Sequence, residues 1–145
     1  MIYEMDAKRF DDDKIHVVCC SCALARNGLV YDNPEFLVVF TTYKELDNFN
    51  AGIAAFVYNS VIDCEHYVKP VVNNPKLLIP TKERAIVESI IFFDSCDEGL
   101  LIEALKNYLY SNPDLTELYT VADFFKLERS KLDYWIKEAI EDEDE

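Results

Sequence analysis

Hydrophobic and polar residues follow two different patterns along this chain, and the change falls at Pro80. Before it, short runs of apolar, β-branched and aromatic residues are separated by Asn, Asp, Gly and Pro, which is typical of short strands joined by turns. After it, apolar residues recur every three or four positions, which is typical of helices. The pattern therefore predicts an α+β fold in which the sheet comes first.

One helix and a small sheet are predicted before Pro80. Residues 14–27 are predicted as the helix, with Gly28 as its C-cap, although Val17 and Val18 also fit a strand. The apolar positions at helical spacing are Ile15, Val18, Cys22 and Ala25. The four or five expected strands are 36–42, 53–59, 61–64, 67–72 and 76–79, with a turn at 73–75. Since no helices separate these strands, the sheet is expected to be mostly antiparallel.

The stretch from Leu77 to Phe93 joins the two parts of the chain. Pro80 is expected to end the last strand, because it has no N–H to donate, and Thr81 is expected to cap the helix that follows. Glu83 then lies where the helix dipole favours an anion. The residues from 85 to 93 are almost all apolar, so this helix is expected at the centre of the protein.

Three further helices complete a predicted C-terminal array of about four. The first spans 98–111, the second starts after Asp114, which has capping-box spacing with Glu117, and the third starts near Ser130. We expect a single domain, 1–145. It is divided into a polar tail at 1–13, the helix plus sheet at 14–80, the helical half at 81–141 and an acidic tail at 142–145.

Charge narrows the possible functions more than any motif does. The chain has 28 acidic and 14 basic residues and a net charge of −14. Direct binding to nucleic acid or to an anionic membrane needs clustered Lys and Arg, so we expect neither. A basic protein partner, or imitation of nucleic-acid charge, is favoured instead. The sequence has no apolar run that would span a membrane and no signal peptide, and its five cysteines are odd in number, so we expect a cytoplasmic protein with reduced thiols.

No motif identifies a catalytic centre. Cys19-Cys20-x-Cys22 and Cys64-x-His66 contain zinc-type ligands, but their spacing is irregular, and buried cysteine behaves as a small hydrophobe. The three glycines form no phosphate-binding loop. We therefore expect no catalytic residue, metal or cofactor, and no enzyme. An enzyme that uses a cysteine nucleophile, Cys64 or Cys96, or a cysteine-bound metal is the remaining alternative.

Aromatic residues cluster in the helical half, and those outside the core are natural interface anchors. They lie among acidic residues, an arrangement that suits a basic partner and equally suits a solvated helix with a frayed end. The predicted partner-binding residues are Tyr110, Glu128, Asp133, Trp135, Glu138, Glu141, Asp142 and Glu143.

Two stretches of the chain resemble the AbiEi-type antitoxins of type IV toxin–antitoxin systems. The first is Cys22-Ala-Leu-Ala-Arg-Asn-Gly-Leu29 with the strand that follows it, and the second is Ile79-Pro-Thr-Lys-Glu-Arg-Ala-Ile-Val-Glu88. The helical array from 100 to 140 is similar in kind to the tail of that domain. The resemblance implies a protein that neutralises a nucleotidyltransferase toxin. Such antitoxins usually begin with a winged-helix DNA-binding module, and only a polar tail precedes residue 14, so the resemblance extends to the partner-facing domain alone.

These observations predict an acidic module that binds and neutralises another protein, as an antitoxin or immunity protein does. Its partner would present a basic surface, as a toxin or a nuclease does. One alternative is a phage- or mobile-element-encoded inhibitor, such as an anti-CRISPR, that mimics nucleic acid and blocks a nuclease. The other is the cysteine- or metal-dependent enzyme.

Overall fold

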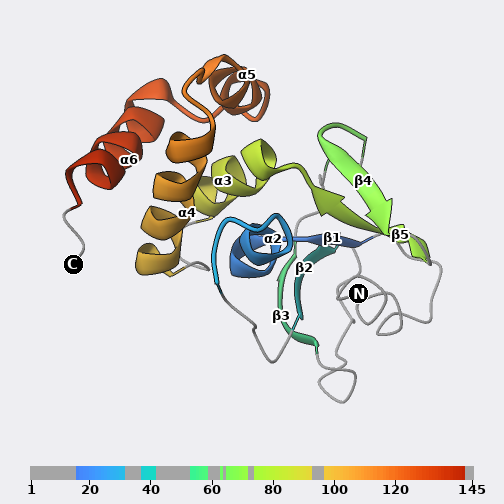
Figure 1. Cartoon of the computed structure of the whole chain (residues 1–145). Helices are drawn as coiled ribbons and strands as arrows, with labels where there is room; N and C mark the ends of the chain where they lie inside the picture. The colour runs from blue at the N-terminus through green and yellow to red at the C-terminus, as the bar shows by residue number, and fades with distance from the viewer. Residues whose placement is uncertain are drawn as a thin grey trace.

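A computed structural model describes residues 16–31, 37–41, 53–58, 63, 65–71, 74–92 and 97–142. Within these ranges the chain forms a five-stranded sheet and five helices (Figure 1). The strands are β1 (His16–Val18), β2 (Leu37–Thr41), β3 (Ile53–Tyr58), β4 (Val68–Val71) and β5 (Asn74–Pro80). The helices are α2 (Cys20–Arg26), α3 (Lys82–Ile91), α4 (Glu98–Ser111), α5 (Thr116–Phe124) and α6 (Arg129–Glu141). The predicted α+β class is confirmed.

The sheet is mixed, and the prediction of a mostly antiparallel sheet is wrong. The strand order is β3-β2-β1-β5-β4. β1 pairs antiparallel with β2 and parallel with β5, β2 pairs parallel with β3, and β4 pairs antiparallel with β5. The three-residue strand β1 therefore holds the centre of the sheet. Pro70 lies in β4, at the edge, where a missing N–H costs no ladder bond to a further strand.

The predicted helix over 14–27 is wrong in its first part, because residues 16–18 form β1 and the helix begins only at Cys20. The β-branched pair Val17-Val18 prefers the extended backbone. The predicted C-cap is confirmed, since Gly28 has a φ of 72°. Its N–H donates to the carbonyl of Ala25, and that of Leu29 donates to Leu24, which is a Schellman ending.

The junction between sheet and helices follows the prediction closely. β5 ends at Pro80, and the Thr81 hydroxyl caps α3 by accepting from the Arg84 N–H at 3.3 Å. The predicted turn at 73–75 is corrected, because β5 already begins at Asn74. Every residue of α3 from Arg84 to Ile90 is buried, so its central position is confirmed.

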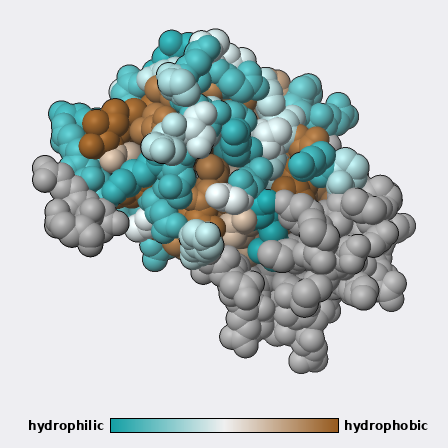
Figure 2. Space-filling view, viewed as in Figure 1, coloured by the Kyte–Doolittle hydropathy of each residue, from teal (hydrophilic) through white to brown (hydrophobic). Residues whose placement is uncertain are grey.

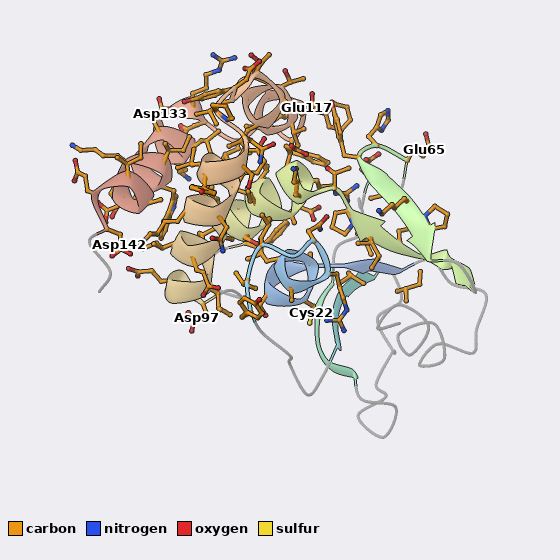
Figure 3. The ribbon with its side chains drawn as sticks, viewed as in Figure 1. Cys22, Glu65, Asp97, Glu117, Asp133 and Asp142 are labelled. Carbon is orange, nitrogen blue, oxygen red and sulfur yellow. The ribbon has the colours of Figure 1, made fainter. Side chains whose placement is uncertain are left out.

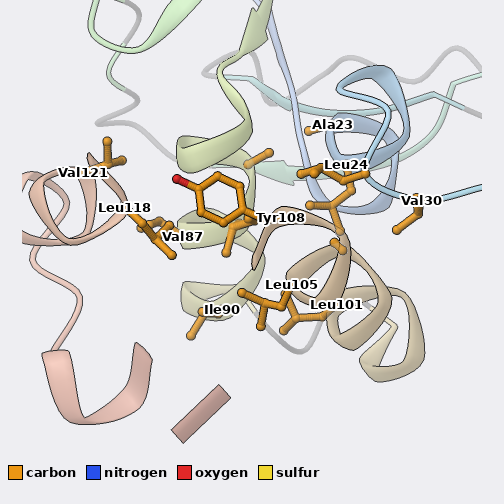
Figure 4. Close-up of a cluster of buried hydrophobic side chains, with 14 of the residues drawn as sticks. Ala23, Leu24, Val30, Val87, Ile90, Leu101, Leu105, Tyr108, Leu118 and Val121 are labelled. Atoms are coloured by element: carbon orange, nitrogen blue, oxygen red, sulfur yellow. The ribbon is translucent and has the colours of Figure 1, made fainter. Parts of the chain in front are cut away.

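One core joins the sheet to the helices. Figure 1 shows α2 and α3 against the sheet, with α4, α5 and α6 beyond them. Val18, Leu77 and Ile79 of the sheet belong to the same buried cluster as the helix residues, and Figure 4 shows its middle around Tyr108. Val17 and Leu78 alternate with those sheet residues, so they point to the opposite face of the sheet, and they are buried there as well.

The remaining helices lie close to their predicted ranges. α4 covers Glu98–Ser111, α5 covers Thr116–Phe124, and α6 begins at Arg129, one residue before Ser130. The Asp114 carboxylate accepts from the N–H and the hydroxyl of Thr116, at 3.0 and 2.7 Å, and so stabilises the start of α5. The polar tail 1–13, most of the predicted strand 61–64 and residues 143–145 lie outside the described ranges, and Asp63, described alone among 61–64, is not in a strand.

Candidate functional site

The two stretches that resemble the antitoxin family meet where α2 and β5 end. The side chain of Asn27 donates to the carbonyl of Ala23 at 2.8 Å and to the carbonyl of Pro80 at 2.9 Å. Glu83, on the first turn of α3, accepts from the Tyr108 hydroxyl at 2.9 Å. Thr81 is the helix cap, as described above. These residues therefore have structural roles in positioning α2 and α4 around α3.

Arg84 is the buried centre of a polar network. Its side chain is only 1% exposed, and Nε donates to Oε2 of Glu88, one helical turn later, at 2.9 Å. Nη1 donates to the carbonyl of His66 and Nη2 to the carbonyl of Asp63, both at 2.8 Å, and Nη1 lies 3.4 Å from the Asp63 carboxylate. Arg84 is therefore paired with the carboxylates of Glu88 and Asp63, and its hydrogen bonds tie the 63–67 segment to α3.

The environment of this network shifts the pKa values of Glu88 and Asp63 in opposite directions. Burial raises the pKa of Glu88 to about 7, against the charge and hydrogen bond of Arg84, which lower it. Among the described residues, Glu88 Oε1 is buried without a hydrogen-bond partner, which accounts for the strength of that effect. Burial also acts to raise the pKa of Asp63, but hydrogen bonds from His66 and the charge of Arg84 outweigh it, so that pKa lies below its ordinary value.

Four rings form an aromatic patch beside this network. We define it as His66, Tyr67, Phe124 and Phe125. The ring centroids of His66 and Phe124 are 4.7 Å apart, those of Tyr67 and Phe124 are 5.5 Å apart, and those of Phe124 and Phe125 are 4.9 Å apart. The guanidinium of Arg84 lies 4.9 Å from the centroid of Phe125. Phe124 is nevertheless 43% exposed, and His66 is exposed too.

The predicted partner-binding residues do not gather on one face. Tyr110 is on α4 and 91% exposed, whereas Trp135 is half-buried and packs against the core. The neighbouring Tyr134, in edge-to-face contact with Trp135, is the more exposed ring at 56%. Glu138 is half-buried and Glu141 is exposed. Figure 3 labels Asp133 and Asp142 at opposite ends of α6.

Several of the predicted acidic residues already have partners. Asp133 accepts a hydrogen bond from the Tyr119 hydroxyl, and Asp142 pairs with Lys106 at 3.0 Å. Glu128 is exposed at the N-cap of α6, and Glu143 lies outside the described residues. Lysines also interrupt the acids on α6, at Lys131 and Lys137. The surface of α6 therefore carries mixed charge, and the region from 97 to 142 as a whole has eleven acidic and five basic residues, which is a net charge of −6.

The predicted cysteine ligands do not come together among the residues that the structure describes. Cys19 and Cys22 are both fully buried, while the side chains of Cys20, Cys64 and Cys96 lie outside the described part. Across the described ranges, no three His, Cys, Asp or Glu side chains are placed to hold a metal ion. No helix within those ranges is long and apolar enough to cross a membrane.

Comparison of the sequence with models of protein families and with curated proteins finds no match. The resemblance to AbiEi-type antitoxins therefore stays a hypothesis based on the residues quoted for it. The aromatic patch is the feature that sequence reasoning missed. Its two halves lie 58 residues apart, from His66 to Phe124, and nothing local in either segment indicates the other.

Proposed function

We propose that this chain is an acidic protein-binding module that neutralises a protein partner, in the manner of an antitoxin or immunity protein. The observation that carries the proposal is the set of large apolar and aromatic side chains exposed on an acidic surface. Tyr110 is 91% exposed, Ile140 70% and Tyr134 56%. Exposed rings of this kind are the usual anchors of protein interfaces.

The surface views support this interpretation. Figure 2 shows hydrophobic side chains in several places on one face, each bordered by hydrophilic ones. An apolar anchor inside a polar rim is the common anatomy of a protein interface. The net charge of −14 makes a basic partner the favourable one, because opposite charges steer association.

Lysines within the acidic helix favour a shaped protein contact over imitation of nucleic acid. Lys131 and Lys137 stand between Asp133, Glu138 and Glu141 on α6. A surface that imitates a nucleic-acid backbone would present an unbroken series of negative charges. We therefore favour antitoxin-like neutralisation, in the cytoplasm, over a nuclease-directed mimic. The family resemblance makes a nucleotidyltransferase the expected target.

Co-expression with the product of the neighbouring gene tests this proposal. If that gene encodes a nucleotidyltransferase toxin, the chain is expected to restore growth and to co-purify with it. The complex is expected to weaken several-fold when salt is raised from about 0.1 M to about 0.5 M, because charge attraction is screened. Growth arrest that persists, with no complex at either salt concentration, would refute the antitoxin proposal.

A second arm separates protein binding from nucleic-acid mimicry. Double-stranded DNA or RNA is added to the purified complex in excess. A mimic occupies the same site as the nucleic acid, so competition would displace the chain. We expect the complex to survive, since the proposed contact depends on shaped apolar anchors as well as on charge.

A further inference from the structure

The aromatic patch is exposed although it is built from rings that normally stay inside a protein. Phe124 is 43% exposed and the side chain of His66 53% exposed. The two rings come from separate parts of the fold, His66 from the segment before β4 and Phe124 from the last position of α5. Figure 3 labels Glu117 beside α5 and Glu65 beside the segment before β4, both on the upper side of the molecule.

Hydrogen bonds hold the His66 side of the patch in place. The buried guanidinium of Arg84 donates to the carbonyls of Asp63 and His66. The Asp63 carboxylate accepts from the His66 N–H at 3.0 Å and contacts Nδ1 of the same ring at 2.9 Å. The Thr81 N–H donates to the carbonyl of Tyr67 at 2.8 Å. A ring that is ordered before binding loses little entropy when a partner docks, which is a property of strong interface anchors.

The backbone of the patch is also strained. Tyr67 has a φ of 60°, in the left-handed region that ring-bearing residues rarely adopt. Strain of this kind persists only where the surroundings enforce it, and it concentrates at functional positions. Here the enforcing contacts are those of Arg84 and Thr81, and their effect is to direct the Tyr67 ring to the edge of Phe124, in T-shaped contact.

Two exposed acidic residues lie on the same two segments as the patch. Glu65 adjoins His66 in the sequence and is exposed. Glu117 is exposed on α5 seven residues before Phe124, a spacing that puts both on the same face of that helix, two turns apart. Neither carboxylate has a hydrogen bond or ion pair within the described part of the chain. Of the nearby cations, Arg129 is paired with Asp123, and Lys126 lines a cavity together with Phe125, Ile91 and Lys131.

Among the described residues the chain twice combines a guanidinium, a ring and a carboxylate. Arg84 lies over Phe125 while it binds Glu88, and Arg129 lies 5.1 Å from the centroid of Tyr119 while it binds Asp123 at 2.8 Å. The exposed His66–Phe124 pair of the patch has no guanidinium stacked on it within the described part of the chain, since the buried Arg84 lies over Phe125. A planar guanidinium suits both groups, because it can stack on a ring and form two parallel hydrogen bonds to a carboxylate.

We infer that the aromatic patch is the docking site for an arginine side chain of a basic protein partner, stacked on the His66–Phe124 pair and paired with Glu65 or Glu117. The inference rests on the proposed function, since it assigns the contact surface of that function. It adds the aromatic patch to the contact surface of that function, beside the exposed side chains of α4 and α6.

The probe is a short peptide, acetyl-Gly-Arg-Gly-Arg-Gly-amide, titrated into the full chain and followed by NMR. Two matched peptides replace arginine with lysine, which keeps the charge, or with citrulline, which keeps the shape and loses the charge. The arginine peptide is expected to shift the ring signals of His66 and Phe124 first. It should bind more tightly than the lysine peptide, and the citrulline peptide should not bind. Binding of all three peptides with equal affinity, or shifts confined to α4 and α6, would overturn the inference.

Three variants sharpen the test. Phe124→Ala and Phe124→Leu both remove the π face, and the second keeps the apolar bulk so that the fold is preserved. Each variant is expected to bind the arginine peptide about fivefold more weakly than the wild type does. Tyr31→Ala removes an even more exposed ring, from a position outside the patch and outside the anchors on α4 and α6, and is expected to leave the affinity within twofold. Equal effects of Tyr31→Ala and Phe124→Leu would show that the peptide binds any exposed ring, and the inference would fail.

The inference and the proposed function can fail separately. With the co-expressed toxin, loss of neutralisation by Phe124→Leu and its retention by Tyr31→Ala supports both. If Phe124→Leu neutralises normally, the function stands and the docking site is wrong. If the wild-type chain forms no complex with the toxin, the proposed function fails even where the arginine peptide binds the patch.

Discussion

Replacing Glu88 by Gln should change how the stability of this protein depends on pH. The Glu88 carboxyl is 4% exposed, Oε1 has no partner, and burial raises its pKa from 4.5 to about 7. Between these values the folded chain holds a proton on Glu88 that the unfolded chain has lost. The free energy of unfolding therefore falls as pH rises from 4.5 to 7, and it stays lower above pH 7.

The size of this effect follows from the shift itself. A change of one pKa unit corresponds to about 1.4 kcal/mol, so the shift of Glu88 corresponds to roughly 3 kcal/mol between pH 4.5 and pH 8. In Glu88→Gln the amide oxygen still accepts from Arg84 Nε, and no buried carboxyl can ionise at position 88, while the charged Arg84 keeps Asp63 as its ionised partner. The variant should equal the wild type near pH 4.5 and exceed its stability at pH 8 by up to that amount.

Urea unfolding at pH 4.5, 6, 7 and 8, followed by circular dichroism in the presence of a reductant, measures this difference. The range stops at pH 4.5 because Asp63, whose pKa is lowered, loses its stabilising charge in more acidic solution. Glu98→Gln removes the same charge from an exposed position and controls for net charge. If Glu88→Gln is less stable than the wild type at pH 8, Arg84 holds Glu88 ionised and the reasoning is refuted.

Four other substitutions test the contacts and the backbone of the fold, each by urea or thermal unfolding. Arg84→Ala leaves Glu88 buried without its cation and is expected to cost about 3–5 kcal/mol of stability before any loss of binding; a loss of binding at unchanged melting temperature would contradict this. Asn27→Ala removes the hydrogen bonds to the carbonyls of Ala23 and Pro80 and should lower the free energy of unfolding by about 1–3 kcal/mol. An unchanged stability would mean that water replaces both hydrogen bonds. Lys126, at the end of α5, has a φ of 62° and occupies the same left-handed position that Gly28 occupies after α2. Lys126→Gly should therefore stabilise the protein by about 1 kcal/mol, while Gly28→Ala should destabilise it. Effects of the same sign at the two positions would contradict the backbone argument.

The helical half could be predicted from the sequence because its information is local. The period of Leu101, Leu105 and Tyr108 puts them on one face of α4, and all three are buried. The Thr81 cap and the Gly28 ending were predictable for the same reason, since each depends on its immediate neighbours. β1 was missed because Ile15, Val18, Cys22 and Ala25 also satisfy a helical period. What makes residues 16–18 a strand is pairing with Leu77 and Leu78, about 60 residues away.

The candidate site was harder to predict, because it depends on side-chain direction and on tertiary contact. On a helix, one residue corresponds to a rotation of about 100°, and this separates the exposed Tyr134 from the half-buried Trp135. Patterns of acidity indicated a charged surface but not which acids have partners, as Asp133 and Asp142 do. The aromatic patch exists only because Arg84 brings the segment around His66 to the end of α5.

The central position of β1 has a consequence for the order in which this protein folds. β1 leaves the ribosome among the first residues, yet its parallel partner β5 follows about 60 residues later. Closing a loop of that length costs entropy that local contacts do not. The antiparallel pair β4–β5 and the helices after Pro80 depend only on contacts between residues close in the sequence, so they can form first. The free edge of β5 is then available to pair with β1. β1 would then be inserted last between β5 and β2, and completion of the sheet would set the rate at which the whole protein folds.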